Sequence, residues 1–395
     1  MQSAINKSRP QDGQGKGAAK KPGEIQTTSV LLSFKQMLVI PTVFTLALFL
    51  VSLLPRVQSN ETLILSFWGA CAALLIWAVL LYSKAVTSGK RKGFILTKPK
   101  PQHYIQAMVH LSVYFYWGWA WPPVQQYALL LVGQLFFAYA FDMLLGWSRR
   151  DTYLLGFGPF PIIFSTNLFL WFRDDWFFLQ FIMIAVGFMG KEFVRWNRDG
   201  RMTHIFNPSA FTLGLFSLIL IVTGTTDITW GSQIASTLSL APGIYTYLFI
   251  GGLVVMYFFS ITLVAASAAM VLFGLSALYF SITGVPYFLD SAIPTAVFLG
   301  LHLLVTDPST SPRTPTGKLC FGVLYGLGVF ALYTILDVFG SPTFYDKLLC
   351  VPLLNLSVQW IDRMVLPLRN NRMLERLGLG VTPSRRANLG HMAVW

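Results

Sequence analysis

Long hydrophobic runs fill most of this chain, and their length is what a lipid bilayer requires. A helix needs about 20 apolar residues to cross the hydrocarbon core. Only 11% of the residues are charged, whereas a soluble domain carries about 25%. The sequence therefore predicts an all-α polytopic membrane protein with about 12 transmembrane helices. The runs, with soft edges, are 33–54, 62–83, 104–121, 124–147, 156–172, 176–194, 208–223, 244–262, 264–283, 291–306, 318–338 and 344–364.

The positions of the positive charges predict how the chain is oriented. The chain has 29 Lys and Arg residues and a net charge of +13. If the basic N-terminus is placed inside, only Arg56, Arg173 and Lys347 fall outside. Basic loops stay in the cytoplasm, so we predict a bacterial inner-membrane protein with both termini cytoplasmic. Cations at membrane ends set topology and meet lipid headgroups, so we expect membrane lipids and no nucleic acid as partners.

The spacing of the runs divides the chain into four parts. Residues 1–29 are polar and without periodicity, which predicts a disordered basic cytoplasmic tail. Residues 30–100 form a two-helix membrane prefix and a basic loop, and 366–395 form a second basic cytoplasmic tail. The ten runs within 101–365 divide into two sets of five, in each of which the third run is short and contains Pro. An odd number of helices per set turns the second set over, which predicts a 5+5 inverted repeat with a site near the interface.

A polar segment before the run at 208–223 contains a helix start. Asn207 precedes Pro208, and this pair suits a cap followed by a first turn. Arg201 and His204 lie just upstream, after other cations at 191–198. Cations beside a helix N-terminus favour an anion or phosphate site. The alternative is a set of cytoplasmic cations followed by an ordinary cap.

A second polar segment, 306–312, follows the short run at 291–306. Its hydroxyls, prolines and single acid predict a rigid turn rich in hydrogen bonds. Such a turn either holds the polar edge of a ligand or only joins two helices. The candidate binding residues here are Thr306, Asp307, Thr310 and Ser311.

Two further candidates lie in the middle of the Pro-containing run at 156–172. Thr166 and Asn167 are polar, and polar groups at this depth are costly in lipid unless they line a site. The alternative is a hydrogen bond between helices.

The sequence does not show the ligand spacing that metal centres need. The three cysteines form no C-x-x-C pair, so we expect free thiols rather than zinc, iron–sulfur or disulfide chemistry. His103 and His110 share one helical face. A haem would need two histidines that reach one iron deep in the membrane, and the sequence does not indicate such a pair. Trp117, Trp147 and Trp171 lie at the ends of runs, where we expect interfacial anchors.

The two polar segments together resemble one family. The pieces 204–211 (HIFNPSAF) and 306–312 (TDPSTSP) are similar to those of the RnfD-type membrane subunit of the Rnf electron-transport complex and of its relative, the NqrB-type subunit of the sodium-translocating NADH:quinone reductase. The resemblance covers roughly residues 100–365 and includes the ten-helix plan. Residues 1–97 lie outside it.

The resemblance implies flavin-mediated electron transfer, coupled to ion movement in the full complexes. It also implies an FMN joined through phosphate to a Thr in an outer-side Ser-Gly-Ala-Thr motif. The corresponding loop here is 233–240 (QIASTLSL), in which Thr237 and Ser236 are the candidate residues. This loop lacks the Gly, so FMN or riboflavin bound without a covalent link is the other expectation.

Three functions follow as hypotheses. The first is a flavin-binding electron-transport subunit, which needs other electron-transfer subunits or a soluble redox donor because the chain lacks a nicotinamide fingerprint. The second is a small-solute or ion transporter or channel, since inverted repeats with broken helices suit solute passage equally well. The third is a membrane scaffold. Whether the chain is an enzyme stays open.

Overall fold

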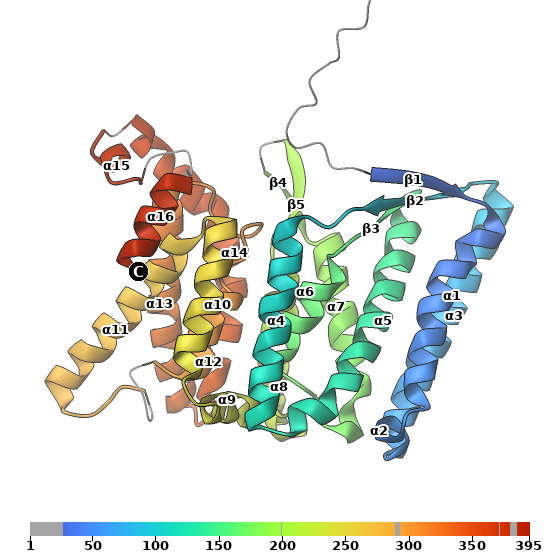
Figure 1. Cartoon of the computed structure of the whole chain (residues 1–395), viewed down its shortest axis with the longest axis horizontal. Helices are drawn as coiled ribbons and strands as arrows, with labels where there is room; N and C mark the ends of the chain where they lie inside the picture. The colour runs from blue at the N-terminus through green and yellow to red at the C-terminus, as the bar shows by residue number, and fades with distance from the viewer. Residues whose placement is uncertain (1–26, 199, 289–292, 371, 380–384) are drawn as a thin grey trace, which may run out of the picture.

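The computed structural model describes residues 27–198, 200–288, 293–370, 372–379 and 385–395. Most of this part of the chain is helical, and many of the long helices run between the same two ends of the molecule (Figure 1). The elements in chain order are β1 (Thr27–Leu32), α1 (Phe34–Ser52), α2 (Pro55–Gln58), α3 (Glu61–Ser88), β2 (Lys92–Thr97), α4 (Pro101–Ala120), α5 (Pro123–Arg149), β3 (Thr152–Leu155), α6 (Pro159–Asn167), η1 (Asp174–Trp176), α7 (Phe178–Phe193), β4 (Arg195–Arg198), β5 (Arg201–His204), α8 (Pro208–Thr223), η2 (Thr226–Ile228), α9 (Gly231–Thr237), η3 (Leu238–Leu240), α10 (Ile244–Phe259), α11 (Thr262–Thr283), α12 (Thr295–Leu303), α13 (Pro315–Val338), η4 (Thr343–Tyr345), α14 (Asp346–Val365), η5 (Leu366–Asn370), α15 (Arg372–Arg376) and α16 (Arg385–Val394).

The helices support a membrane-embedded protein. Each predicted hydrophobic run overlaps mainly one long or short α-helix of the structure, and α3, α4, α5, α11, α13 and α14 extend beyond their runs. Among the described residues, five stretches are long and apolar enough to cross a membrane: α3, α5, α11, α13 and Thr343–Leu368, which contains α14. A sixth candidate is the stretch Gly231–Leu240 followed by α10, which is bent by 99°. The third run of each set, 156–172 and 291–306, holds the shortest of these helices, α6 and α12, with nine residues each.

Two small sheets were not expected from an all-α prediction. Strand β1 pairs antiparallel with β2, β2 pairs parallel with β3, and β4 and β5 form a hairpin. The last three residues of the predicted disordered tail, 27–29, belong to β1, and residues 1–26 of that tail lie outside the described residues. The first sheet joins the prefix (β1, β2) to the ten-helix part (β3).

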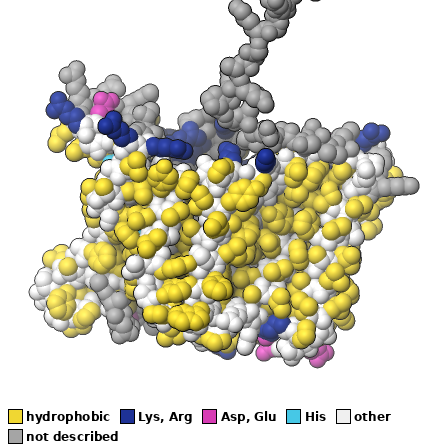
Figure 2. Space-filling view, in the orientation of Figure 1, with side chains coloured by type: hydrophobic (Ala, Val, Ile, Leu, Met, Phe, Trp, Pro, Cys, Tyr) yellow, Lys and Arg dark blue, Asp and Glu magenta, His cyan; other side chains and the backbone are white. Residues whose placement is uncertain are grey.

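The two ends of the molecule differ in charge. In Figure 2, apolar side chains cover the face between the ends, and Lys and Arg gather at the end that carries β1–β3, α15 and α16. We call this the basic end. Arg56, Arg173 and Lys347 lie at the opposite end, beside α2, η1 and η4. There Arg56 forms an ion pair with Asp174 over 2.8 Å.

The C-terminal tail packs against the helices of the second set. Asn388 of α16 is buried and accepts a hydrogen bond from the Thr262 hydroxyl at 2.9 Å. Its amide donates to the Met256 carbonyl at 3.2 Å. Trp395 lies 5.7 Å from the ring of Phe249. The tail predicted for 366–395 is therefore docked through α16.

Helices α11 and α13 approach closely because α13 presents two glycines four residues apart. A Cβ atom at Gly322 would lie 2.1 Å from the Ser267 hydroxyl oxygen and 2.3 Å from the Val264 carbonyl oxygen. A Cβ at Gly326 would lie 2.9 Å from the Ala268 carbonyl oxygen. Small residues at this spacing let two helix backbones touch, as in other membrane helix pairs.

We expect Gly322→Ala to destabilise the protein, because the added methyl group forces α13 away from the α11 backbone. The cost should be about 1–3 kcal/mol, as for other overpacked sites, and thermal unfolding in detergent measures it. Gly274→Ala on α11 is the matched control, since no atom lies within 4 Å of its Cβ position. Equal melting temperatures for the two variants would contradict this account of the contact.

Candidate functional site

The two polar segments singled out in the sequence meet at one cavity near the basic end. The cavity has a volume of about 240 Å³. His204 and Asn207 line it from one segment, and Thr306 and Asp307 line it from the other. The remaining walls come from α4, α6, α10 and the ends of α7 and α12. We call this the basic-end cavity.

Asn207 shapes the cavity by starting α8. Its side-chain oxygen accepts hydrogen bonds from the backbone N–H groups of Ser209 and Ala210, at 3.0 and 3.3 Å. Its amide donates to the Leu304 carbonyl at 3.3 Å, which ties α8 to the end of α12. The cap therefore occupies N–H groups that a phosphate at this helix start would need.

Of the cations predicted near this helix start, Lys191 lines the cavity. Arg201 is exposed on β5 and does not line it. The ordinary-cap interpretation therefore fits this segment better than a phosphate site at the helix start.

Asp307 organises the second segment. Its carboxylate accepts hydrogen bonds from the Ser309 hydroxyl at 2.8 Å and from the Thr310 hydroxyl at 3.0 Å. The Ser309 hydroxyl also lies 3.1 Å from His204 Nε2, so the two segments touch directly. Thr306 donates to the His302 carbonyl at 2.6 Å. The segment is the rigid turn that its composition predicts.

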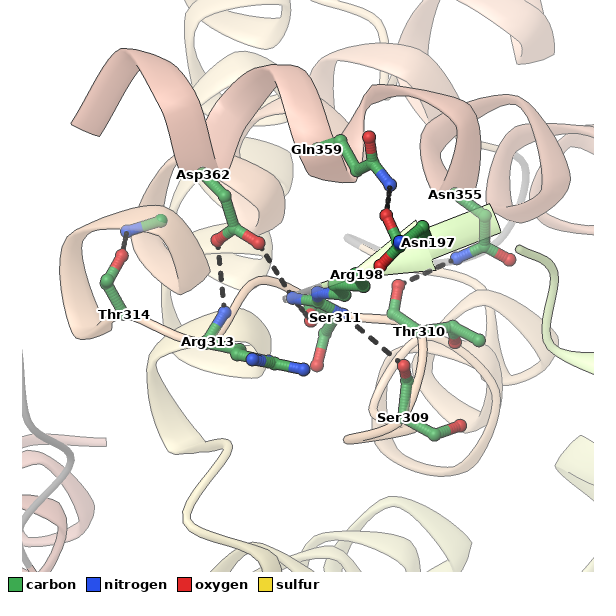
Figure 3. A network of polar contacts seen from close by, with 11 residues as sticks. Asn197, Arg198, Ser309, Thr310, Ser311, Arg313, Thr314, Asn355, Gln359 and Asp362 are labelled. Carbon is green, nitrogen blue, oxygen red and sulfur yellow. Dashed lines mark hydrogen bonds and ion pairs between the residues drawn. The ribbon is translucent and has the colours of Figure 1, made fainter. Parts of the chain in front are cut away.

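A buried arginine holds this turn from behind (Figure 3). The Arg198 side chain donates to the Asp362 carboxylate at 2.7 Å and to the Ser311 carbonyl at 3.0 Å. The Asn355 amide donates to the Thr310 carbonyl at 3.1 Å. Thr310 and Ser311 are buried in this network and do not line the cavity. They fix the shape of the turn, while Asp307 and Ser309 face the cavity.

Asn167 belongs to a separate buried network between helices. Its amide donates to the Gln134 side-chain oxygen at 2.7 Å, and its oxygen accepts from Gln180 at 3.1 Å. All three side chains are buried. Neither Asn167 nor its buried neighbour Thr166 lines the basic-end cavity, which Ser165 does. The geometry of Asn167 is the helix-to-helix hydrogen bond that was the alternative expectation.

Ser236 and Thr237 lie at the opposite end of the molecule. Ser236 lines a cavity of about 330 Å³ together with the buried pair Asp346 and Lys347, whose charged atoms are 3.1 Å apart. We call this the opposite-end cavity. Thr237 does not line it, because the Thr237 hydroxyl donates to the Gln233 carbonyl at 2.6 Å. The predicted binding residues are thus divided between two ends.

A series of ring contacts connects Thr237 with the basic-end cavity. The Trp117 indole donates to the Thr237 hydroxyl at 3.3 Å, and His103 at the other end of the series lines the cavity. Neighbouring ring centroids are separated by 6.3, 5.5, 4.1, 5.1 and 5.0 Å. The rings in order are Trp117, Tyr114, Phe164, Phe160, Phe157 and His103.

The tryptophans differ from the interfacial role expected of them. Trp117, Trp147 and Trp171 are each at most 1% exposed. They belong to the core, whereas Trp119 and Trp176 are exposed as anchors would be. A position at the end of a hydrophobic run therefore did not distinguish a core tryptophan from an interfacial anchor.

Sequence reasoning missed several residues of the cavity wall. His110 is buried, with Nε2 3.2 Å from the Ser165 hydroxyl. The shared helical face of His103 and His110 was visible in the sequence, but nothing in it indicated that α4 packs beside α6 and α10. Lys191 was grouped with its neighbouring cations.

Neither a scan of protein-family models nor a search of curated proteins finds a match for this chain.

Burial lowers the pKa of His204 below its ordinary value, and nearby Lys191 and Arg195 lower it further, while Asp307 opposes them. In the unfolded chain His204 would titrate near its ordinary pKa of about 6.5. The unfolded state therefore takes up the proton first as the pH falls, and acid favours unfolding.

We expect the wild type to lose more thermal stability than His204→Gln between about pH 7.5 and pH 5, since only the wild type has this half-buried imidazole to charge. Unfolding curves in detergent across this range measure the difference. His391→Gln, on α16 away from the cavity, is the control and should follow the wild type. Parallel pH profiles for wild type and His204→Gln would refute the assignment.

Proposed function

We propose that this protein is a membrane-embedded electron-transport subunit that binds a flavin in the basic-end cavity. The observation that carries the proposal is the convergence of two segments far apart in the sequence, 204–209 and 306–309, on one cavity. These are the segments on which the resemblance to the RnfD-type and NqrB-type membrane subunits rests. Electrons would come from partner subunits or a soluble redox donor.

We further propose that the chain sits in a bacterial inner membrane with its basic end and both termini in the cytoplasm. The enrichment of Lys and Arg at one end of the molecule supports this orientation. The short α6 and α12 would enter the membrane from opposite sides. The proposal therefore counts about 12 membrane helices, among them two that do not cross completely.

The proposed inverted repeat relates α4–α8 to α10–α14, and the two cavities support it. The basic-end cavity is lined by the start of α6, the end of α7 and the start of α8. The opposite-end cavity is lined by the start of α12, by Tyr333 near the end of α13 and by the start of α14. These are the third, fourth and fifth helices of each set, as a two-fold axis in the membrane plane would require.

The residues of the basic-end cavity fit a flat ring system with a polar edge. Pro161, Ile162 and Leu303 give it apolar walls, while His204 and Asp307 bring polar groups to one side. Its volume of about 240 Å³ lies just below the range of about 300–1,000 Å³ that is usual for small-ligand sites. A ligand with a longer side chain would therefore extend out of the cavity.

The chain's own groups would orient and tune such a ligand. A flavin supplies both one-electron and two-electron redox chemistry when bound. Ser309, held between Asp307 and His204, offers a hydroxyl at a fixed position. Lys191 brings a positive charge to the wall, which favours electron-rich ligand atoms. The ring series from His103 to Trp117 gives closely spaced aromatic groups toward the opposite end.

The opposite end fits a phosphate-linked cofactor poorly. Lys347 is already paired with Asp346, so the cavity has no unpaired cation among its described residues. The Thr237 hydroxyl faces Trp117 and Gln233 rather than the cavity. We therefore propose noncovalent binding of FMN or riboflavin at the basic end over covalent attachment at Thr237.

A transporter is the second candidate function, and α12 favours it. This nine-residue helix has a cavity at each end, one lined by Leu303 and one lined by Pro294, Ala296 and Val297. A short helix between two cavities at opposite ends suits alternating access.

We expect purified wild-type protein to contain flavin that acid precipitation releases into the supernatant. The variant His204→Gln/Asp307→Asn should retain at most about one tenth of the flavin that the wild type contains. The reason is that losing hydrogen bonds to a buried ligand costs about 1.4 kcal/mol or more. Absorbance per folded protein is the measurement. Arg201→Gln, on the exposed strand, and Thr237→Ala should both keep the flavin.

Two other results would contradict the proposal of noncovalent flavin binding. Flavin in the acid pellet that disappears in Thr237→Ala would replace noncovalent binding with covalent attachment. Well-folded wild type without flavin would overturn the redox proposal. In that case, uptake of a small solute into liposomes that contain the protein alone would support the transporter.

A further inference from the structure

A third cavity, larger than the two above, lies away from both of them, between the prefix and the ten-helix part. It has a volume of about 520 Å³. Its walls are the basic ends of α3 and α5, and the sheet formed by β1, β2 and β3 lies beside it. We call it the prefix cavity. Nothing in the proposed redox function uses it.

Five cations line the prefix cavity where α3 and α5 end, and we call this part of the cavity its rim. Asp151 is the one carboxylate among its described lining residues, and it pairs with Lys92 at 3.0 Å. Arg150 pairs with Glu192 at 2.9 Å. Within the described part of the chain, the other three cations form no ion pair. These three are Lys84, Lys90 and Arg149.

The prefix cavity also has an apolar wall, formed mainly by side chains of α3. Trp77 and Trp147 line it, and their indole N–H groups are occupied by the Ser148 hydroxyl and the Gly93 carbonyl. Leu80 also lines it and is 62% exposed. Ile76, one helical turn farther from the basic end, is exposed to the same extent. The cavity thus continues into an uncovered apolar surface of α3.

We propose that the prefix cavity binds an anionic phospholipid from the leaflet at the basic end. The rim cations would hold the headgroup phosphate, and an acyl chain would lie along Leu80 and Ile76. Basic pockets between membrane helices bind anionic lipid headgroups by this combination of charge and depth. The inference rests on membrane embedding and is independent of the flavin proposal.

Some of the rim cations also have a role that does not involve a ligand. Cations near the C-terminal ends of α3 and α5 complement the helix dipoles. That effect needs no cavity and no apolar wall. A soluble phosphate, in turn, would use the rim alone and gain nothing from the apolar wall. The combination of cations at the rim and an apolar wall therefore favours a lipid.

The test uses the full chain purified in detergent and mixed with equal amounts of phosphatidylglycerol and phosphatidylcholine. Native mass spectrometry counts the bound lipids. We expect the wild type to prefer phosphatidylglycerol by about tenfold or more, since each nearby cation adds appreciable attraction for anionic lipid. The variant Lys84→Gln/Lys90→Gln/Arg149→Gln should lose that preference. Arg149 stacks on Phe193, so Lys84→Gln/Lys90→Gln, which keeps this contact, is measured in parallel.

The matched control removes three cations from the same end of the molecule. Arg91→Gln/Lys98→Gln/Lys100→Gln changes exposed residues that do not line the cavity, and it should keep the preference. Three results would overturn the proposal: no preference in the wild type, an equal loss in the control, or displacement of the lipid by inorganic phosphate at millimolar concentration. The last would make the site one for soluble phosphate. Flavin content should be unchanged in every variant, which separates this inference from the proposed function.

Discussion

The structure depends on how two short helices end inside an apolar layer. At 1.5 Å per residue, α6 and α12 each extend about 14 Å, roughly half of a hydrocarbon core. Their last carbonyl groups would face lipid without partners unless the protein supplied them. Around α6, the Trp171 indole donates to the Asn167 carbonyl at 2.5 Å. Around α12, Thr306 and Asn207 donate to the carbonyls of His302 and Leu304.

This requirement explains why a cavity and a polar network occur together. The groups that satisfy the broken end of α12 come from the start of α8 and from the turn after α12, so these segments must meet. Where they meet, helices of nine residues leave space that longer helices would fill. Arg198, which pairs with Asp362, then fixes the turn through the Ser311 carbonyl. One structural need thus brings together the two segments that carry the groups proposed to hold a ligand.

Hydrophobicity and Pro placement predicted where the helices lie, because both effects are local. The run at 208–223 coincides with α8, and Asn207 is its cap as expected. The partners of the polar segments could not be predicted, because Asn355 and Asp362 lie on α14, and their packing is a long-range property. The strands were missed for a similar reason: β3 has four residues, and its pairing with β2 rather than its composition stabilises it.

Which residue of a short helix faces a ligand depends on helix phase, and that is where sequence reasoning is weakest. Successive side chains of an α-helix are rotated by about 100°, so adjacent residues already point in different directions and residues two apart point to nearly opposite sides. On α6 the cavity receives Ser165, while Asn167 faces the helices of its own set. On α9 the opposite-end cavity receives Ser236, while Thr237 faces Trp117. In both cases the cost of burying a polar group predicts that each side chain has a partner, and only the packing of neighbouring helices decides whether that partner is protein or ligand.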